Sequence, residues 1–65
     1  MNEIKNLNIT MEQIKENAKK FNYEYDTVEW DGGECIIVYQ SMYYQITYYF
    51  NEDKVLVDVK AEEVK

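Results

Sequence analysis

The sequence predicts an α+β domain in which one N-terminal amphipathic helix packs on a four-stranded antiparallel β-meander. Three observations support this fold class. A capping box opens a segment with helical spacing, runs of β-branched and aromatic residues follow it, and short turn sequences separate those runs. The 65 residues are expected to form a single small domain, with an N-terminal arm over 1–9, the helix over 10–22, the sheet over 23–61 and a charged tail over 62–65.

The helix is expected from about Met11 to Phe21. It follows a Thr-x-x-Gln capping box at Thr10, whose side chains satisfy backbone N–H groups that the first helical turn leaves without partners. Asn22 is a residue type that ends helices in the left-handed conformation. The apolar positions lie on one narrow stripe, so the helix needs a sheet to cover; they are Met11, Ile14, Ala18 and Phe21.

The expected strands are Tyr23–Trp30, Cys35–Gln40, Tyr43–Phe50 and Lys54–Ala61. Two-residue turns are predicted at Gly32-Gly33 and at Ser41-Met42, and a polar four-residue connection is predicted to begin at Asn51. The aromatic residues at the start of the first strand fall out of phase with Val28 and Trp30. A bulge is therefore expected near Asp26 or Thr27.

These turns fix a register, because directly opposed residues share a face of the sheet. The register puts a nearly continuous apolar face under the helix, made of Val28, Trp30, Cys35, Ile37, Tyr39, Tyr44, Ile46, Tyr48, Phe50, Val55, Val57, Val59 and Ala61. The opposite face is polar at its margins but also contains apolar and aromatic residues, namely Ile36, Val38, Tyr43, Tyr49 and Leu56. One helix cannot cover both faces of a sheet.

The second apolar patch has two interpretations. The N-terminal arm, through Ile4 and Leu7, or aromatic residues from the loops could cover it. Alternatively, it is an interface with a second copy or with another protein, since apolar patches with polar rims mark binding sites and tyrosine is enriched at interface centres.

An acidic run occupies the first predicted strand and the turn after it: Glu24, Asp26, Glu29, Asp31 and Glu34. No lysine or arginine lies between Phe21 and Asp53. The run is either a solvated strand edge that keeps the protein soluble or an array that imitates nucleic-acid phosphates. Carboxylates at alternate strand positions lie roughly 6.6 Å apart, which is close to the phosphate spacing along one strand. Such an array would attract a basic protein partner.

The composition argues against several functions. Thirteen carboxylates against seven lysines give a net charge of -6, and arginine is absent, which disfavours direct binding to nucleic acid or membranes. Histidine is absent and Cys35 is the only cysteine, so a Cys/His zinc site and a thiolate–imidazole pair are excluded. No catalytic residue, cofactor or metal is predicted, and Cys35 is expected to be a small buried residue.

The chain contains no apolar run typical of a signal peptide or a membrane span, and we expect it in the cytoplasm of a bacterial host cell. In size, acidity and lack of catalytic residues it resembles small phage-encoded proteins that block host enzymes or defence systems, including nucleic-acid mimics and anti-CRISPR proteins. This likeness is one of overall profile and covers no motif.

Two hypotheses follow for the function. In the first, the protein is a non-enzymatic acidic inhibitor or regulator that binds a basic, nucleic-acid-handling partner through the acidic run. In the alternative, it is a structural or interaction module that forms a homodimer through the uncovered face of the sheet.

Overall fold

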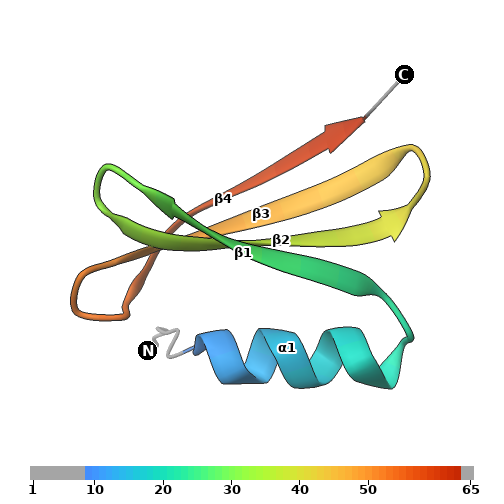
Figure 1. Cartoon of the computed structure of the whole chain (residues 1–65), viewed down its shortest axis with the longest axis horizontal. Coiled ribbons are helices and arrows are strands. Elements are labelled where there is room, and N and C mark those ends of the chain that lie inside the picture. Colours follow the sequence, from blue (N-terminus) through green and yellow to red (C-terminus); the bar gives the residue numbers. More distant parts are fainter. Residues whose placement is uncertain (1–8, 64–65) are drawn as a thin grey trace, which may run out of the picture.

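The computed structural model describes residues 9–63 and has the element order α-β-β-β-β. Helix α1 (Met11–Lys20) precedes β1 (Glu24–Trp30), β2 (Gly33–Ser41), β3 (Tyr44–Asn51) and β4 (Leu56–Glu63). The strands form one antiparallel sheet in the order β1-β2-β3-β4 (Figure 1), which confirms the predicted fold class. The predicted arm over 1–9 lies outside the described residues except for its last residue, and β4 extends into the predicted tail.

Both ends of α1 follow the predicted signals. The Thr10 hydroxyl accepts a hydrogen bond from the Gln13 amide at 3.1 Å, and the Thr10 amide donates to the Gln13 side-chain oxygen at 3.0 Å. At the other end Asn22 has a φ of 65°, in the left-handed region. The Tyr23 and Asn22 amides then donate to the carbonyl oxygens of Ala18 and Lys19, at 2.7 and 3.1 Å, which is the Schellman arrangement.

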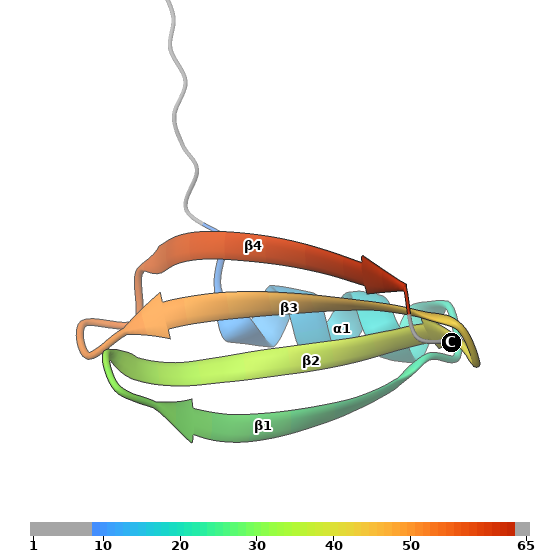
Figure 2. The same ribbon diagram turned by 90° about the horizontal axis from the view of Figure 1, so that it is seen from above.

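One helix covers one side of the sheet. Figures 1 and 2 together show α1 beneath β2 and β3, with β4 running outside the area that the helix covers. The buried core between the two layers consists of Ile14, Ala18, Ile36, Val38 and Phe50. Five partly buried residues pack around it: Met11, Tyr23, Tyr25, Tyr48 and Leu56.

The first hairpin turns one residue earlier than predicted. Trp30 lies opposite Gly33, so the two turn residues are Asp31 and Gly32, and Cys35 lies opposite Val28 instead of Trp30. This moves the pairing by two residues, which leaves the two strands' shared faces unchanged because side chains alternate with a period of two. The bulge expected near Asp26 is wrong, since β1 and β2 pair without interruption.

The second hairpin contains the irregularity that the sequence did not reveal. Ser41 lies opposite Tyr44, so the turn is Met42-Tyr43, and Tyr39 lies opposite Gln45. Gln40 is therefore an extra residue on β2, that is, a β-bulge. The one-residue offset exchanges the two faces of β2 relative to β3, so that Ile36 and not Ile37 shares a face with Tyr48.

The predicted assignment of faces is consequently wrong for β1 and β2 and correct for most of β3. Ile36 and Val38, expected on the uncovered side, are 0% and 5% exposed in the core beneath α1. Val28 and Trp30, expected in that core, lie with Cys35 on the other side of the sheet. The phase difference within β1 thus needs no bulge, because Tyr25 packs on the helix side and Trp30 on the opposite side.

The third connection, unlike the first two, is longer than predicted. Phe50 lies opposite Leu56 and not Val55, and the register shifts again between Tyr49 and Phe50. The Asn51 side-chain oxygen holds the turn by accepting from the amides of Asp53 and Val55, at 2.8 and 3.0 Å. The three valines of this segment were expected in the core, but all are exposed because α1 does not reach them; they are Val55, Val57 and Val59.

Gly33 occupies a position that no other residue fits. Its φ is 153°, and a β-carbon there would overlap the carbonyl oxygen of Phe50 and lie 2.7 Å from the carbonyl carbon of Asn51. Both atoms belong to the backbone of the neighbouring strand, so they cannot move aside without separating β2 from β3. Gly32, by contrast, faces only the indole ring of Trp30, at 2.7 Å.

We predict that Gly33→Ala lowers the free energy of unfolding by roughly 3 kcal/mol, through backbone overlap and an unfavourable φ. Gly32→Ala is the matched control and should cost less, because the added β-carbon would meet the Trp30 side chain and not the backbone of β3. Urea unfolding followed by far-UV circular dichroism measures both. Equal stability of the two variants would contradict the proposed role of Gly33.

Candidate binding surface

The side of the sheet away from α1, here called the helix-free face, is the candidate site. Its members follow from the register and from the core residues on the other side. They are Glu24, Asp26, Val28 and Trp30 of β1, Gly33, Cys35, Ile37 and Tyr39 of β2, Gln45, Thr47 and Tyr49 of β3, and Asp58, Lys60 and Glu62 of β4.

Trp30 is fixed at one end of this face. Its indole Nε1 donates a 2.9 Å hydrogen bond to the carbonyl oxygen of Phe50, two strands away. The side chain can pass over β2 because Gly33, which lies opposite Trp30 and Asn51, has no side chain. The indole also packs edge-to-face on Tyr49, with the ring centroids 5.1 Å apart and the planes at 74°.

Beneath these rings lies a small second core. Cys35 and Thr47 are 5% and 6% exposed although no helix covers their side of the sheet. Cys35 lies between Val28 and Tyr49 in the register. The prediction that Cys35 is buried is therefore confirmed, but it is buried on the helix-free face and not under α1. Val28 and Trp30 remain 47% and 36% exposed and form the apolar part of the surface.

Polar groups frame the aromatic residues. The Tyr39 hydroxyl donates to the Asp26 carboxylate at 3.0 Å, and this hydrogen bond is the main reason that the pKa of Tyr39 is raised above its ordinary value. The Lys60 ammonium lies 5.8 Å from the centre of the Tyr49 ring. Four carboxylates and one lysine lie on the face, so its charge is negative: Glu24, Asp26, Asp58, Glu62 and Lys60.

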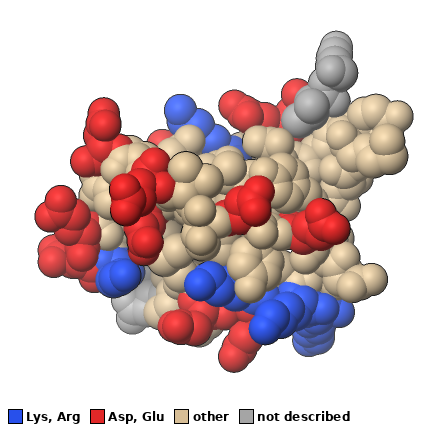
Figure 3. Space-filling view, viewed as in Figure 1, with Lys and Arg blue, Asp and Glu red and all other residues tan. Residues whose placement is uncertain are grey.

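The structure divides the predicted acidic run. Glu24 and Asp26 point to the helix-free face, Asp31 lies in the turn, and Glu29 and Glu34 face each other on the helix side. Glu34 is also paired with Lys54 at 3.4 Å. A single row of carboxylates at phosphate spacing is therefore not formed. In Figure 3 acidic side chains gather at the end of the sheet where the β1–β2 and β3–β4 turns lie, whereas most basic side chains lie along α1.

The predicted apolar interface is also dispersed. Ile36 and Val38 are core residues, and Leu56 packs against that core. Tyr43 is 65% exposed in the β2–β3 turn. Of the five predicted residues, only Tyr49 belongs to the helix-free face, so the predicted patch does not exist as one surface.

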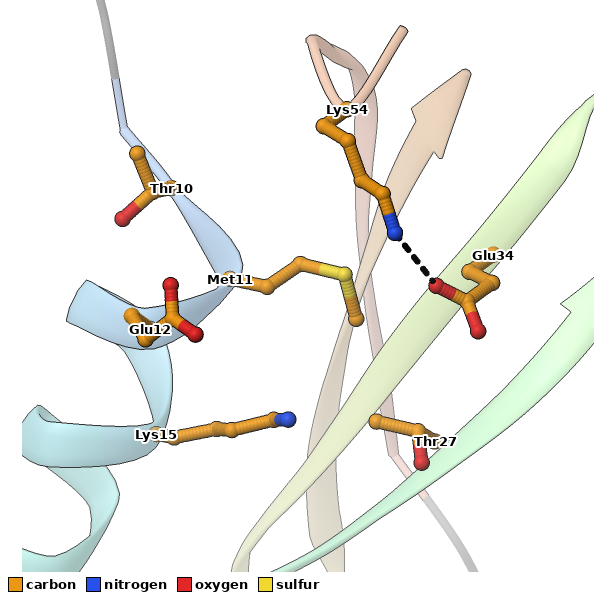
Figure 4. Close-up of a pocket in the computed structure, with 7 residues that line it drawn as sticks. All are labelled: Thr10, Met11, Glu12, Lys15, Thr27, Glu34 and Lys54. Carbon is orange, nitrogen blue, oxygen red and sulfur yellow. Dashed lines mark hydrogen bonds and ion pairs between the residues drawn. The ribbon is translucent and has the colours of Figure 1, made fainter. Parts of the chain in front are cut away.

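A hollow of about 410 Å³ lies on the other side of the molecule, between the start of α1, β1, β2 and the β3–β4 turn. Figure 4 shows Met11 directed into it, with the Lys54–Glu34 ion pair at one side and Lys15 directed toward Thr27. Its lining combines two lysines, two carboxylates, two threonines and a thioether. This set offers charged groups for contacts with a polar ligand, but no thiol or imidazole nucleophile.

Among residues 9–63, no three His, Cys, Asp or Glu side chains are close enough together to hold a metal ion. The helix within this range is too short and too polar to cross a membrane. Comparisons with known proteins add no further information: no family model, curated protein or solved structure matches the chain.

The sequence prediction placed Val28 and Trp30 under the helix and not on the helix-free face, for one reason. The alternation of Val28 and Trp30 with polar neighbours indicates that they share a face, and the sequence prediction recognised this. Which face meets the helix depends on the bulge at Gln40, which has no glycine or other marker. Tyr23 and Tyr25 were the available signal, since both lie close to the helix in sequence and pack on its side.

We predict that Trp30→Phe lowers the free energy of unfolding by about 1 kcal/mol, because it removes the hydrogen bond to Phe50 while an aromatic ring remains to pack on Tyr49. Urea unfolding followed by far-UV circular dichroism measures the change. Unaltered stability would show that the indole N–H contributes nothing.

A second prediction concerns the phenol of Tyr39. Its pKa and that of Tyr48, which burial raises, lie above 10.0, so the folded state keeps both protons to higher pH than the unfolded chain does. Stability should therefore fall as the pH rises above about 10. Asp26→Ala should lower the pKa of Tyr39 toward its ordinary value, as measured by NMR titration of the tyrosine Cζ resonances.

Two controls make this titration specific. Glu24→Ala removes a neighbouring carboxylate without removing the hydrogen bond, and it should change the pKa of Tyr39 less than Asp26→Ala does. The pKa of Tyr48, on the other side of the sheet, should change in neither variant. An unchanged pKa of Tyr39 in Asp26→Ala would contradict the hydrogen bond.

Proposed function

We propose that the protein is a small, non-enzymatic, acidic binding protein that inhibits or regulates a partner with a basic surface. The partner would be a nucleic-acid-handling protein, and the role would be of the anti-defence or nucleic-acid-mimic kind. The contact surface would be the helix-free face. One observation carries the proposal: this face presents exposed aromatic and aliphatic side chains together with four carboxylates and a single lysine.

The arrangement suits the division of roles found in protein interfaces. Tryptophan and tyrosine at the centre contribute most to affinity when they become buried, and Trp30 and Tyr49 lie side by side on this face. The surrounding carboxylates accelerate encounter with a basic partner and favour it over acidic ones. Trp30 is already held by its hydrogen bond to Phe50, so binding would not have to immobilise it.

The division of the acidic run changes which carboxylates should matter. Glu24 and Asp26 lie on the helix-free face, on the same strand as Trp30, whereas Glu29 lies on the helix side. We therefore place the electrostatic contribution in the first pair. The mimicry would be one of charge and not of an ordered row of phosphates.

A binding function also agrees with the chemistry of the side chains. The sequence contains no histidine or arginine, and its one thiol, Cys35, is buried under the aromatic residues. Carboxylates, phenols and an indole on a flat sheet supply contacts more readily than general acid–base catalysis.

The test is affinity capture from bacterial lysates with matched charge-reversed baits. Glu24→Lys combined with Asp26→Lys should abolish capture of a basic, nucleic-acid-handling protein. Glu12→Lys combined with Glu16→Lys makes the same change in net charge on α1 and should leave capture unchanged. Circular dichroism verifies that each bait is folded, and purified partner activity with and without the protein measures inhibition.

Salt gives a second readout. Capture by the unaltered protein should weaken as ionic strength rises, because the carboxylates act through screened charge. Capture that resists salt and survives the reversal of Glu24 and Asp26 would overturn the proposal. Glu29→Lys combined with Asp31→Lys separates the two halves of the acidic run; loss of capture in that variant alone would place the contact at the turn.

A further inference from the structure

The outer edge of β4 is a second candidate for an interaction surface; it adjoins the helix-free face and shares Asp58 and Lys60 with it. In the strand order β1-β2-β3-β4, β4 has a sheet neighbour on one side only. It is eight residues long, from Leu56 to Glu63, and α1 does not cover it (Figure 2). Val57 and Val59 are 50% and 46% exposed. A long edge strand with exposed valines is a template for pairing with another strand.

One hydrogen bond shows how this edge is oriented. The Val59 amide donates to the carboxylate of Asp58, its neighbour in the chain, at 2.8 Å. The Asn51 amide donates to the Val55 carbonyl oxygen at 2.9 Å, so by alternation along β3 the backbone groups of Tyr49 and Thr47 also face β4, whereas those of Tyr48, which lies opposite Val59, face β2. The Val59 N–H is therefore directed away from β3, toward the outside of the sheet, where a further strand could accept from it.

Pairing between two copies of β4 is restricted by symmetry. The two-fold axis of an antiparallel pair is perpendicular to the sheet, so it keeps each residue on its own face. Opposed residues share a face, so the axis must pass next to a residue that lies opposite its own copy. The candidate registers therefore differ only in which residue occupies that position.

Charge and length of overlap together discriminate among these registers. With Ala61 on the axis Lys60 would lie opposite Glu62, but only residues 59–63 of each strand would pair, whereas Val59 on the axis pairs residues 56–62. Asp58 and Lys60 lie on the same face, opposite Tyr49 and Thr47 of β3. With Val59 on the axis, each Asp58 lies opposite the Lys60 of the other copy, and Val59 lies opposite itself. With Asp58 or Lys60 on the axis, that residue lies opposite its own like charge, which is destabilising.

The other edge of the sheet offers no such match. Between its ends β1 contains three carboxylates, Glu24, Asp26 and Glu29, and no lysine. Self-pairing of β1 would thus bring only negative charges together. β4 differs from β1 because it carries both an acidic and a basic residue, Asp58 and Lys60, on the same face.

We propose that the protein self-associates as a two-fold dimer through antiparallel pairing of β4 with β4, in the register that places Val59 on the axis. The two four-stranded sheets then become one continuous sheet, with both helices on the same side. The Asp58 carboxylate exchanges its bond to the Val59 amide for the Lys60 ammonium of the second copy. Val57 and Ala61 lie opposite each other between the helices, and the two helix-free faces adjoin.

Charge exchange tests this register in sedimentation-equilibrium experiments from micromolar to millimolar concentration. Asp58→Lys and Lys60→Asp should each weaken the dimer roughly tenfold, because every dimer contains the contact twice. Combining the two substitutions restores opposite charges and should restore the dissociation constant. Glu52→Lys, in the β3–β4 turn, matches the net-charge change of Asp58→Lys and should not weaken the dimer.

For Asp58→Lys, the direction of the change in dimer affinity decides between the local contact and general charge repulsion. It makes the net charge of -6 less negative, so general repulsion between copies falls. Weaker association can then come only from the local contact. Stronger association would mean that the Asp58 carboxylate opposes pairing at an otherwise unpaired edge, and it would overturn the proposal.

Two further readouts keep the proposal falsifiable. The Val59 amide should become protected from hydrogen exchange as the concentration rises, while circular dichroism verifies folding of every variant. A folded monomer at all concentrations, or a dimer that is insensitive to both single substitutions, would overturn the proposal. Because neither result involves a basic partner, the test is independent of the function of the helix-free face.

Discussion

The β-bulge between Tyr39 and Ser41 is the constraint on which the rest of the structure depends. Side chains alternate along a strand, so one extra residue decides which half of β2 meets α1. With the bulge, Ile36 and Val38 enter the core and Phe50 is buried with them. Without it, Ile36 and Val38 would lie on the side opposite Tyr48 and Phe50, and the other half of β2, with Ile37, would share their face instead. A helix with a narrow apolar stripe can cover only one side, and the bulge places Ile36 and Val38 on that side.

The sheet consequently has two unequal cores. The larger one lies under α1, and the smaller one is covered only by side chains from the sheet itself. Trp30 closes the smaller core by reaching across Gly33 to the Phe50 carbonyl and packing on Tyr49. Among residues 9–63, α1 is the one helix, and it covers the opposite side of the sheet. The aromatic residues of the helix-free face therefore remain partly exposed, and the feature that limits stability also provides a surface for binding.

Two surfaces of different character result. The helix-free face combines aromatic residues with carboxylates, which suits a basic partner. The outer edge of β4 has charges of both signs, which suits a second copy of itself. Since β4 contributes to both surfaces, self-association would place two acidic faces next to each other. It would thereby raise the effective concentration of the binding surface for a partner with repeated basic sites.

The sequence by itself determined the local features. The capping box at Thr10, the stop at Asn22 and the number of strands all depend on residues close together in the chain, and each was predicted correctly. Register depends on a single extra residue, and Gln40 has no local signature, so only the tertiary structure decided which face each strand buries. The candidate site was accordingly predicted in part. Tyr49, Glu24 and Asp26 were recognised as surface residues, but Trp30 was assigned to the core, because its place depends on packing across three strands.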